Sequence, residues 1–594
     1  MNRATTRFEA NALLTLNADT INQRFDCQAS SRVIDITWPD ITWHVTCRGQ
    51  THTGNARSCC AVDVSAIVQR SQQGSLRDEL NLDGNAELIQ PCQANSIMMH
   101  TPHWQHSYQA LGRAYTATVA PEPATAPEWM AWNEALATEI EWPDMWRKTD
   151  LALAAFSGRG ELEGAKPSAS VYAGHQFGQY NPQLGDGRAV LLGEWTRSDA
   201  ERFDIQLKGA GQTPYSRGGD GKSPVGPVVR EFLLSEAMHH LGVPTTRALG
   251  AIATGDRVYR NDMEPGAVIV RVAKSHLRFG SIQYFAMTRD GDGLAELVEY
   301  AAERHFADIL AAKDATTLEA KAEVLLEATV KRIASLVAHW QSLGFVHGVM
   351  NTDNMLLSGE TIDYGPCAFV DTYQADAVFS AIDSHGRYRL SNQPGIGHWN
   401  TSVLASCLLK VLNSQEDKAV AYAQSVIDEF PRWYTDAFKT RIAAKLGLDS
   451  FRPEDTELHD TFLTILERDA LDLTLAYRWL THQALDDANH TPIGDLFTPS
   501  EDLIEWTASW RQRRAVNKGD NQETADLMRR ANPVVIPRNH LVASAIGDAE
   551  SQDYDKLEAA FIRWQQPFDW HDDDALWAAT PTGSERVTRT FCGT

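Results

Sequence analysis

Apolar and polar residues alternate in short stretches of the first half of the chain, which is the pattern of half-buried β-strands. The clearest are residues 203–208 (FDIQLK) and 268–273 (VIVRVA), and residues 33–38 show the same alternation. Glycine-rich turns lie on both sides of the strand at 203–208. The first half is therefore predicted to be rich in β-structure, with Lys208 at the end of a strand.

Longer stretches place apolar residues three and four positions apart, as an amphipathic helix does. One runs over residues 228–241, where Pro227 opens the helix and Gly242 and Pro244 end it. The others are residues 129–140, 318–343, 403–412, 419–430, 460–480 and 523–530. Beyond residue 290 the pattern becomes mainly helical, so an α+β chain with a β-rich part followed by a helical part is expected.

Composition and charge exclude several classes of protein. The 594 residues are 43% hydrophobic, and 54 basic against 78 acidic residues give a net charge of −24. An acidic chain of this kind is not expected to bind nucleic acid or an anionic membrane. No run of eighteen apolar residues and no apolar leader segment occur, so a cytoplasmic protein is predicted.

The helix at 318–343 leads into the stretch that carries the candidate chemistry. Residues 347–354 read HGVMNTDN, to be compared with the kinase pattern H-R-D-x-x-x-x-N. The His and the terminal Asn354 match, but the kinase base would fall on Val349, which cannot accept a proton. Asp353, directly before Asn354, is the carboxylate that remains for that task.

A second motif, Asp363-Tyr364-Gly365, stands for the kinase sequence D-F-G. Mg²⁺ prefers oxygen ligands, so Asn354 and Asp363 are the candidate metal ligands. Residues 355–362 are predicted to form a small hairpin that holds the two loops together.

Positive charge and glycine gather around the predicted strands. Gly185 and Gly187 form a turn that lets the backbone approach a phosphate. Residues 209–222 are a second glycine-rich loop, directly after Lys208. Two further cations, Arg271 and Arg278, exceed what a phosphate pocket for simple kinase chemistry needs.

The helix at 228–241 carries two glutamates that could pair with Lys208. Glu231 and Glu236 are five residues apart, so they lie on different faces of the helix and only one can reach the lysine. Glu231 is the predicted partner.

With these motifs in hand, the chain closely resembles the selenoprotein O family, protein adenylyltransferases with a bilobal kinase-like fold. The likeness rests on YAGHQFGQYNPQLGDGRA, QLKGAGQTPYSRGGDG, VREFLLSEAM, RVAKSHLRFG, HGVMNTDN and DYGP, and it spans about residues 100–594. The resemblance implies ATP bound in reverse relative to kinases, with AMP transferred to Ser, Thr or Tyr hydroxyls of protein substrates and pyrophosphate released.

The resemblance also assigns residues to roles. It implies that Asp353 accepts the proton of the attacking hydroxyl and that Asn354 and Asp363 bind Mg²⁺ or Mn²⁺, Asp363 also lying at the nucleotide. The remaining nucleotide contacts it implies are Gly185, Gly187 and Arg188 at the first glycine turn, Lys208 with its partner Glu231, Arg271 and Arg278 at the outer phosphates, and Asp220 and Gly221 at the adenosine end.

Cys592 looks like the cysteine version of a residue that is selenocysteine in some family members. In relatives it can bridge to a cysteine near the site loops, but the stretch around Phe379 and Ser380 has none, which leaves Cys367 and Cys407 as candidates. Cysteines 27, 47, 59, 60 and 92 form no C-x-x-C pair and are expected to be free thiols.

The predicted organisation has five parts. Residues 1–97 are an N-terminal extension outside the resemblance, either a small β-rich domain or, as we favour, a stretch upstream of a natural start at Met98 or Met99. Residues 98–165 form a family segment packed on the lobes, 166–290 the β-rich N-lobe, 291–560 the helical C-lobe and 561–594 the tail with Cys592. Two alternatives to adenylyl transfer stay open: an ordinary phosphotransferase, and a pseudokinase scaffold that binds ATP without catalysis.

Overall fold

The computed structural model divides the chain into two compact units, Met1–Ser96 and Ile97–Thr594. It describes the backbone of three strands in the first unit and, in the second, residues 103–591 except 261, 289, 486–495, 519 and 572–573. The strands of the first unit form an antiparallel sheet in the order β1 (Arg32–Trp38), β2 (Ile41–Arg48) and β3 (Ala61–Val68). Cysteines 27, 59, 60, 92 and 592 lie outside the described residues, and of Cys47 only the backbone is described.

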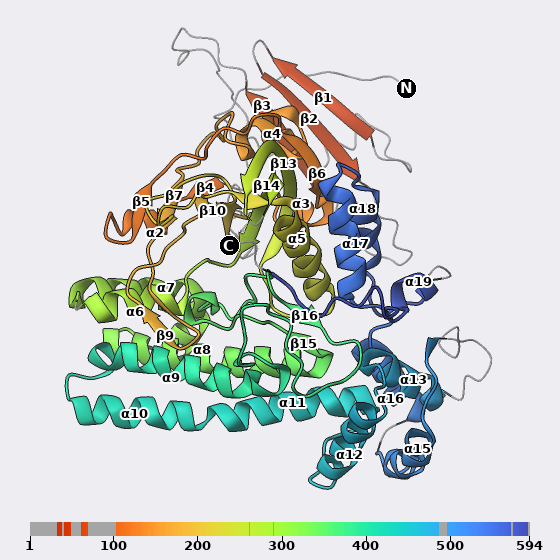
Figure 1. Cartoon of the computed structure of the whole chain (residues 1–594). Helices are drawn as coiled ribbons and strands as arrows, with labels where there is room; N and C mark the ends of the chain where they lie inside the picture. The colour runs from red at the N-terminus through yellow and green to blue at the C-terminus, as the bar shows by residue number, and fades with distance from the viewer. Residues whose placement is uncertain are drawn as a thin grey trace, which may run out of the picture. The chain divides into compact units, whose positions relative to one another are not determined.

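The second unit contains a large antiparallel sheet, drawn above the long helices in Figure 1. Its main strand order is β5-β7-β10-β11-β14-β13-β6, with β12 paired to β14 and β4 to β10. The strands are β4 (His103–Gln105), β5 (Thr116–Thr118), β6 (Glu128–Trp132), β7 (Ser168–Ser170), β10 (Ala189–Thr196), β11 (Arg202–Lys208), β12 (Ser223–Pro224), β13 (Arg247–Tyr259) and β14 (Met263–Ala273).

Alternation along β11 separates the two faces of this sheet. Phe203, Ile205 and Leu207 point into an apolar cluster under the short helices α3 (Glu134–Glu139) and α4 (Asp150–Phe156). Side chains two residues apart point to the same face, so Gln206 and Lys208 are on the opposite face. Helix α5 (Val225–His240) packs on that face and belongs to the second apolar cluster.

Helices make up most of the remaining chain, and α8, α9, α10 and α11 lie side by side in layers below the sheet (Figure 1). Described helices after α5 are α6 (Phe279–Thr288), α7 (Gly291–Lys313), α8 (Leu318–Leu343), α9 (Gln393–Leu412), α10 (Glu416–Asp428), α11 (Phe430–Leu446), α12 (Asp455–Arg468), α13 (Leu473–Leu485), α15 (Glu501–Arg514), α16 (Asn521–Ala531), α17 (Asn539–Glu550), α18 (Asp555–Arg563) and α19 (Asp574–Ala578); α2 (Ser107–Ala110) precedes them. The α+β class is confirmed.

Two predicted helices were wrong in extent. Residues 129–140 divide into β6 and α3, because Trp129 and Trp132 pair with β13 and Asn133 caps the helix by accepting a hydrogen bond from Leu136 N at 3.0 Å. Residues 460–480 divide into α12 and α13, because Asp472 leaves the helical path to pair with the buried Arg538 at 2.8 Å.

The predicted hairpin at 355–362 is also wrong. Leu357 N donates to Leu277 O and Thr361 N to Pro244 O, both at 2.9 Å, so its two arms bond to other segments. The two site loops are joined instead by β15 (Phe345–Val346) and β16 (Ala368–Phe369), which flank them. The apolar residues of 355–362 would be buried either in a hairpin or against distant segments. A short-range pattern could therefore not distinguish the two arrangements.

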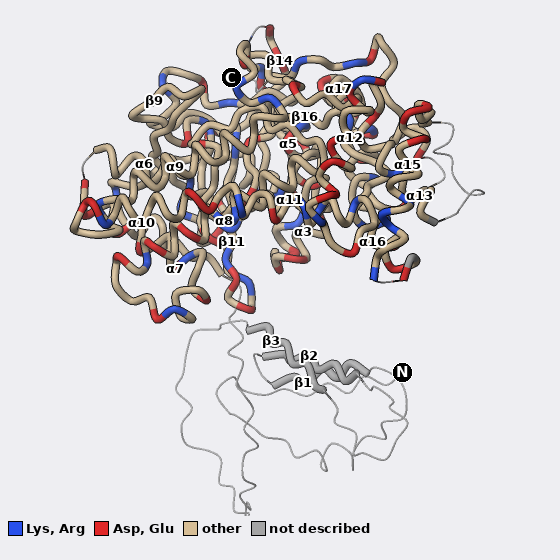
Figure 2. The backbone as a smooth tube through the Cα atoms, turned by 90° about the horizontal axis from the view of Figure 1, so that it is seen from below, with Lys and Arg blue, Asp and Glu red and all other residues tan. Residues whose placement is uncertain are grey.

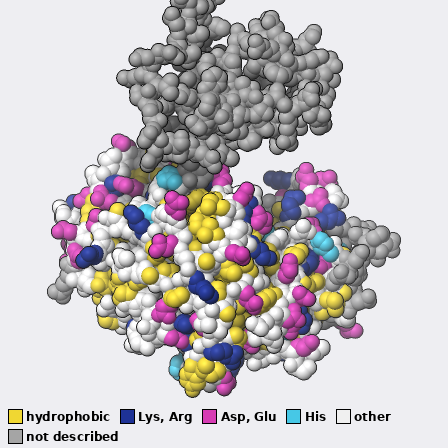
Figure 3. Space-filling view, turned by 90° about the horizontal axis from the view of Figure 1, so that it is seen from above, with side chains coloured by type: hydrophobic (Ala, Val, Ile, Leu, Met, Phe, Trp, Pro, Cys, Tyr) yellow, Lys and Arg dark blue, Asp and Glu magenta, His cyan; other side chains and the backbone are white. Residues whose placement is uncertain are grey.

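Charges of both signs are interspersed along the described backbone (Figure 2) and over the face shown in Figure 3. In the described residues, no helix is long and apolar enough to cross a membrane. Cys367 and Cys407 are buried free thiols, and burial raises the pKa of each to about 12. Thiols of this kind are unreactive.

Candidate active site

The predicted ion pair between Lys208 and Glu231 is present in the core of the second unit. Lys208 Nζ lies 2.7 Å from Glu231 Oε2 and 3.2 Å from Asp363 Oδ1. Lys208 is the last residue of β11, and Glu231 lies in the second turn of α5, which packs on the same sheet face. Glu236 instead binds Arg247, with Nη2 to Oε2 at 2.7 Å, as its position on another helix face requires.

Glu231 is shared between two cations. Its other carboxylate oxygen accepts from Nε of Arg271, and the Arg271 Nη1 donates to Gln206 Oε1 at 3.3 Å. Gln206 and Arg271 are directly opposite in the register of β11 and β14. Burial alone would raise the pKa of Glu231, but the charges of Arg271 and Lys208 lower it to about 2.

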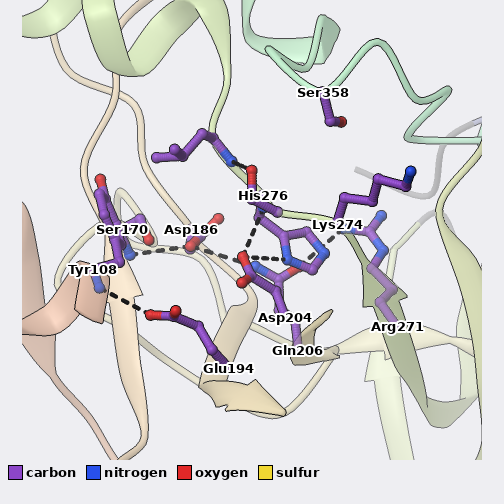
Figure 4. A network of polar contacts seen from close by, with 12 residues as sticks. Tyr108, Ser170, Asp186, Glu194, Asp204, Gln206, Arg271, Lys274, His276 and Ser358 are labelled. Carbon is purple, nitrogen blue, oxygen red and sulfur yellow. Dashed lines mark hydrogen bonds and ion pairs between the residues drawn. The ribbon is translucent and has the colours of Figure 1, made fainter. Parts of the chain in front are cut away.

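This network continues to the first glycine turn, as the close-up in Figure 4 shows. Gln206 Nε2 lies 3.5 Å from Asp186 Oδ2, which also accepts from Ser170 N at 3.0 Å. A buried polar chain therefore runs from Asp186 through Gln206, Arg271, Glu231 and Lys208 to Asp363. It fixes the glycine turn and the Asp-Tyr-Gly loop relative to each other.

Asp363 is partly exposed and has a φ of 67°, in the left-handed region that non-glycine residues rarely adopt. Such conformations are enriched at functional sites, although other described residues, such as Ala200 and Asp314, adopt them too. Desolvation by itself would raise the pKa of Asp363, but the charges of Lys208, Arg271 and Arg188 outweigh it and hold the pKa below its ordinary value. The carboxylate is therefore ionised at neutral pH.

The two predicted metal ligands offer the oxygen atoms that Mg²⁺ or Mn²⁺ requires. Asn354 Nδ2 donates to Val349 O at 3.0 Å, which leaves the amide oxygen as its ligand atom. His347 Nε2 lies 2.9 Å from Ile362 O and so ties the loop of Asn354 to that of Asp363. One carboxylate and one amide oxygen, completed by phosphate oxygens and water, fit the usual Mg²⁺ site of a nucleotide enzyme.

Asp353 lies in the short 3₁₀ helix η2 (Thr352–Asn354) and is only 7% exposed. Burial raises its pKa to about 6, against the opposing effects of Arg278 and Gln176. Arg278 Nη1 donates to the backbone oxygen of Asp353 at 2.6 Å, and its guanidinium stacks 4.7 Å from the centre of the Tyr172 ring. A carboxylate with a raised pKa is suited to accept a proton near neutral pH.

The two glycine-rich loops contact each other. Thr213 Oγ1 donates to Asp186 O at 2.7 Å, and Ser216 Oγ donates to Gly187 O at 2.5 Å. Gly185 has a φ of 137°, and a Cβ there would come within 2.5 Å of the Tyr215 ring, so only glycine fits. The second loop is thus packed against the first turn.

Asp220 and Gly221 lie at the far end of the second loop. The Asp220 carboxylate accepts from both terminal nitrogens of Arg260, at 2.9 and 3.0 Å, and from Lys222 N at 3.0 Å. Gly221 O accepts from Gly211 N at 3.1 Å, which closes the loop. These contacts fix the loop but do not join Asp220 to the buried polar chain.

Sequence reasoning missed three residues of this site. Asp186 and Tyr172 both contact Arg278, and Gln176 contacts Asp353, yet each lies in a segment that sequence reasoning treated only as a turn or motif. The sequence did contain a signal for Asp186, since this carboxylate lies between Gly185 and Gly187. A glycine turn that binds phosphate does not need a carboxylate there. The partners of Gln176 and Tyr172 are more than a hundred residues away in the chain.

Comparison with known proteins decides the family. Residues 98–564 match the family described as Protein adenylyltransferase SelO. The chain belongs to this family. It is 44% identical over 492 residues to a protein of Rhizobium etli named protein nucleotidyltransferase YdiU, covering 83% of this chain and 97% of that one. Proteins of the same name from Bradyrhizobium sp. and Rhodopseudomonas palustris are 43% identical over 499 and 500 residues, covering 84% of this chain and all of theirs.

Membership confirms the predicted resemblance and the enzyme class, a protein nucleotidyltransferase of the SelO family, with ATP as the nucleotide that the family description implies. In the described residues, no group of three or more His, Cys, Asp or Glu side chains could hold a metal ion. The family match names no individual residues, so the roles of the site residues remain predictions.

Proposed function

We propose that this protein binds ATP with a divalent cation and transfers AMP to Ser, Thr or Tyr hydroxyls of protein substrates, releasing pyrophosphate. The observation that carries the proposal is the gathering of Lys208, Arg271 and Arg188 around Asp363, close enough for their charges to lower its pKa. With Arg278 beside Asp353, this is more positive charge than transfer of the terminal phosphate requires.

In the proposed reaction, the acceptor hydroxyl oxygen forms a bond to the α-phosphorus of ATP. The bond between that phosphorus and the oxygen bridging to the β-phosphate breaks, and its electron pair leaves with pyrophosphate. Lys208, Arg271 and Arg278 would stabilise the charge that grows on this leaving group. Lys208 and Arg271 are fixed by Glu231 and Arg278 by the backbone of Asp353, so these cations need not reorganise during the step.

Asp353 would take the hydroxyl proton. Its raised pKa of about 6 keeps it ionised at neutral pH while leaving it basic enough to share a proton with the attacking oxygen. The corresponding kinase position is Val349, which has no acidic group, so Asp353 is the carboxylate available on this loop.

Asn354 and Asp363 would hold Mg²⁺ or Mn²⁺, which supplies charge neutralisation to the phosphates when bound. The contribution of the chain is to keep Asp363 ionised through its neighbouring cations and to tie its loop to that of Asn354 through His347.

We also propose that the architecture is kinase-like and bilobal. Support comes from the antiparallel sheet with Lys208 paired to a helical glutamate, followed by helices, with the two site loops between them. A cytoplasmic location remains part of the proposal, since protein substrates and ATP meet there.

The test uses ATP labelled at the α or the γ position, incubated with the purified protein, Mg²⁺ or Mn²⁺ and a cell extract. Label from the α position alone should stay on protein, and Asp363→Ala should abolish it. Label from the γ position alone would make the enzyme a phosphotransferase. Retention of neither, with ATP still bound, would favour the scaffold function.

A further inference from the structure

A small hairpin covers the loop that carries Asp353. Strands β8 (Gly174–Gln176) and β9 (Gln179–Asn181) form it, outside the large sheet. Three successive hairpin residues contact three successive loop residues. His175 N donates to Thr352 Oγ1 at 2.7 Å, Gln176 Nε2 to Asp353 Oδ2 at 3.2 Å and Phe177 N to Asn351 Oδ1 at 3.0 Å.

Side chains outside the hairpin hold it in this place. Gln283 of α6 lies 2.8 Å from His175 Nδ1 and accepts from Thr352 Oγ1 at 3.0 Å, so these three residues form a closed ring of hydrogen bonds. Tyr388 donates its hydroxyl to Asn351 Oδ1 at 2.6 Å. The hairpin is therefore anchored on both sides of the contact to Asp353.

The two oxygens of the Asp353 carboxylate differ in their surroundings. Oδ2 accepts the hydrogen bond from Gln176, whereas Oδ1 is buried and has no hydrogen-bond partner in the described part of the chain. A Cβ added to Gly174 would lie 2.5 Å from Oδ1 and 3.0 Å from Cγ of Asp353. The missing side chain of Gly174 thus leaves the space that the carboxylate occupies.

We propose that Gln176 is a positioning residue for the transfer reaction: its amide holds Oδ2 of Asp353 while Gly174 borders Oδ1, and together they fix the orientation of the carboxylate that takes the proton of the substrate hydroxyl. This inference rests on the proposed function, because it takes Asp353 to be the proton acceptor. Burying a carboxylate oxygen without a partner is costly. The hydrogen bond from Gln176 offsets part of this cost at the other oxygen of the carboxylate.

The hairpin thereby acts on the reaction through the orientation of one carboxylate and not through the nucleotide. Gln176 hydrogen-bonds to Asp353 and not to the buried polar chain that contacts Lys208 and Asp363. Loss of Gln176 should therefore lower the rate of transfer and leave ATP binding as it is. Because a hydrogen bond to a charged group is worth roughly 1.5 kcal/mol or more, its loss should lower the rate of transfer roughly tenfold.

The test compares three variants of the full chain with the wild type. It uses α-labelled ATP, Mg²⁺ and an acceptor protein that has first been identified in the cell extract by the α label it retains. Gln176→Ala removes the amide, and Gly174→Ala pushes the carboxylate aside without removing it. Gln179→Ala, an exposed residue opposite Gln176 in the hairpin, is the matched control. For each, kcat, the KM for acceptor, the dissociation constant for ATP and the melting temperature are measured.

We expect both Gln176→Ala and Gly174→Ala to lower kcat about tenfold or more, with ATP affinity within error of the control. Gln176→Ala should also keep the melting temperature of the control, whereas the added Cβ of Gly174→Ala is expected to lower it. An unchanged kcat in Gln176→Ala would overturn the inference alone. A higher KM at unchanged kcat would also overturn it, by assigning Gln176 to acceptor binding. If the wild type transfers no α label to protein, the proposed function and the inference fail together.

Discussion

Glu231 allows the sharpest test of the buried polar chain, because a second glutamate of the same helix provides a matched control. Replacing Glu231 with Gln keeps the shape of the side chain and removes the charge shared by Lys208 and Arg271. Glu236→Gln removes an equally buried charge, but its partner Arg247 is not part of the predicted site.

The magnitude follows from the interactions of Glu231. Its pKa is about 2, compared with an ordinary value of 4.5, which corresponds to about 3 kcal/mol of stabilisation of the ionised form. Breaking a buried ion pair by removing one partner costs a similar amount, about 3–5 kcal/mol. Both variants should therefore unfold at clearly lower urea concentration than the wild type.

Only Glu231→Gln should also lose affinity for ATP. Lys208 would keep a single carboxylate partner, Asp363, and would then compete with the metal ion for it. We expect ATP affinity in the presence of Mg²⁺, measured by calorimetry on the folded variant, to fall at least about tenfold, equivalent to about 1.4 kcal/mol. Glu236→Gln should bind ATP like the wild type. Equal ATP affinities in the two variants would refute the reasoning.

Four further predictions concern individual residues. Asp353→Asn should abolish AMP transfer while leaving the dissociation constant for ATP within about twofold, since the residue contacts no predicted phosphate ligand through its side chain; retained transfer would remove it as the base. Asp363→Ala should eliminate Mg²⁺-dependent ATP binding in calorimetry, because a carboxylate ligand is lost; Mg²⁺-dependent binding in the variant would argue against that role. Burial raises the pKa of Glu360 from 4.5 to about 7, so the folded protein holds a proton that the unfolded chain releases, and stability should fall between those pH values by up to about 3 kcal/mol. Urea unfolding at pH 5 and pH 8 should show a smaller fall for Glu360→Gln than for the wild type, and equal falls would contradict this. Burial lowers the pKa of Lys445 from 10.5 to about 7, so Lys445→Met should raise the urea midpoint at pH 7, and a lower midpoint would show that the lysine stabilises the fold.

Much of the local structure could be read from apolar spacing. The helix predicted at 318–343 coincides with α8, and the strands at 203–208 and 268–273 lie within β11 and β14. These segments have patterns long enough for one period to dominate. The errors at 129–140 and 460–480 arose where aromatic packing on β13 or the ion pair of Asp472 with Arg538 outweighed helical spacing.

That only one glutamate of α5 can pair with Lys208 could also be predicted, because helix geometry places Glu231 and Glu236 on different faces, and the structure confirms the choice of Glu231. The sharing of Glu231 with Arg271 could not, because it depends on the register that places Gln206 opposite Arg271. Likewise, the sequence contains Gln176 and Asp353 but gives no sign that they touch, since they are 177 residues apart.

By itself, the sequence determined which groups are available: a carboxylate next to an amide, an Asp-Tyr-Gly loop, glycine turns and a surplus of cations. These are properties of residue type and local spacing. The tertiary structure alone decided which of them meet, through strand register and the docking of the hairpin on the loop of Asp353. The physical reason is that ion pairs and hydrogen bonds act over a few ångströms in space, and only packing brings distant residues within that range.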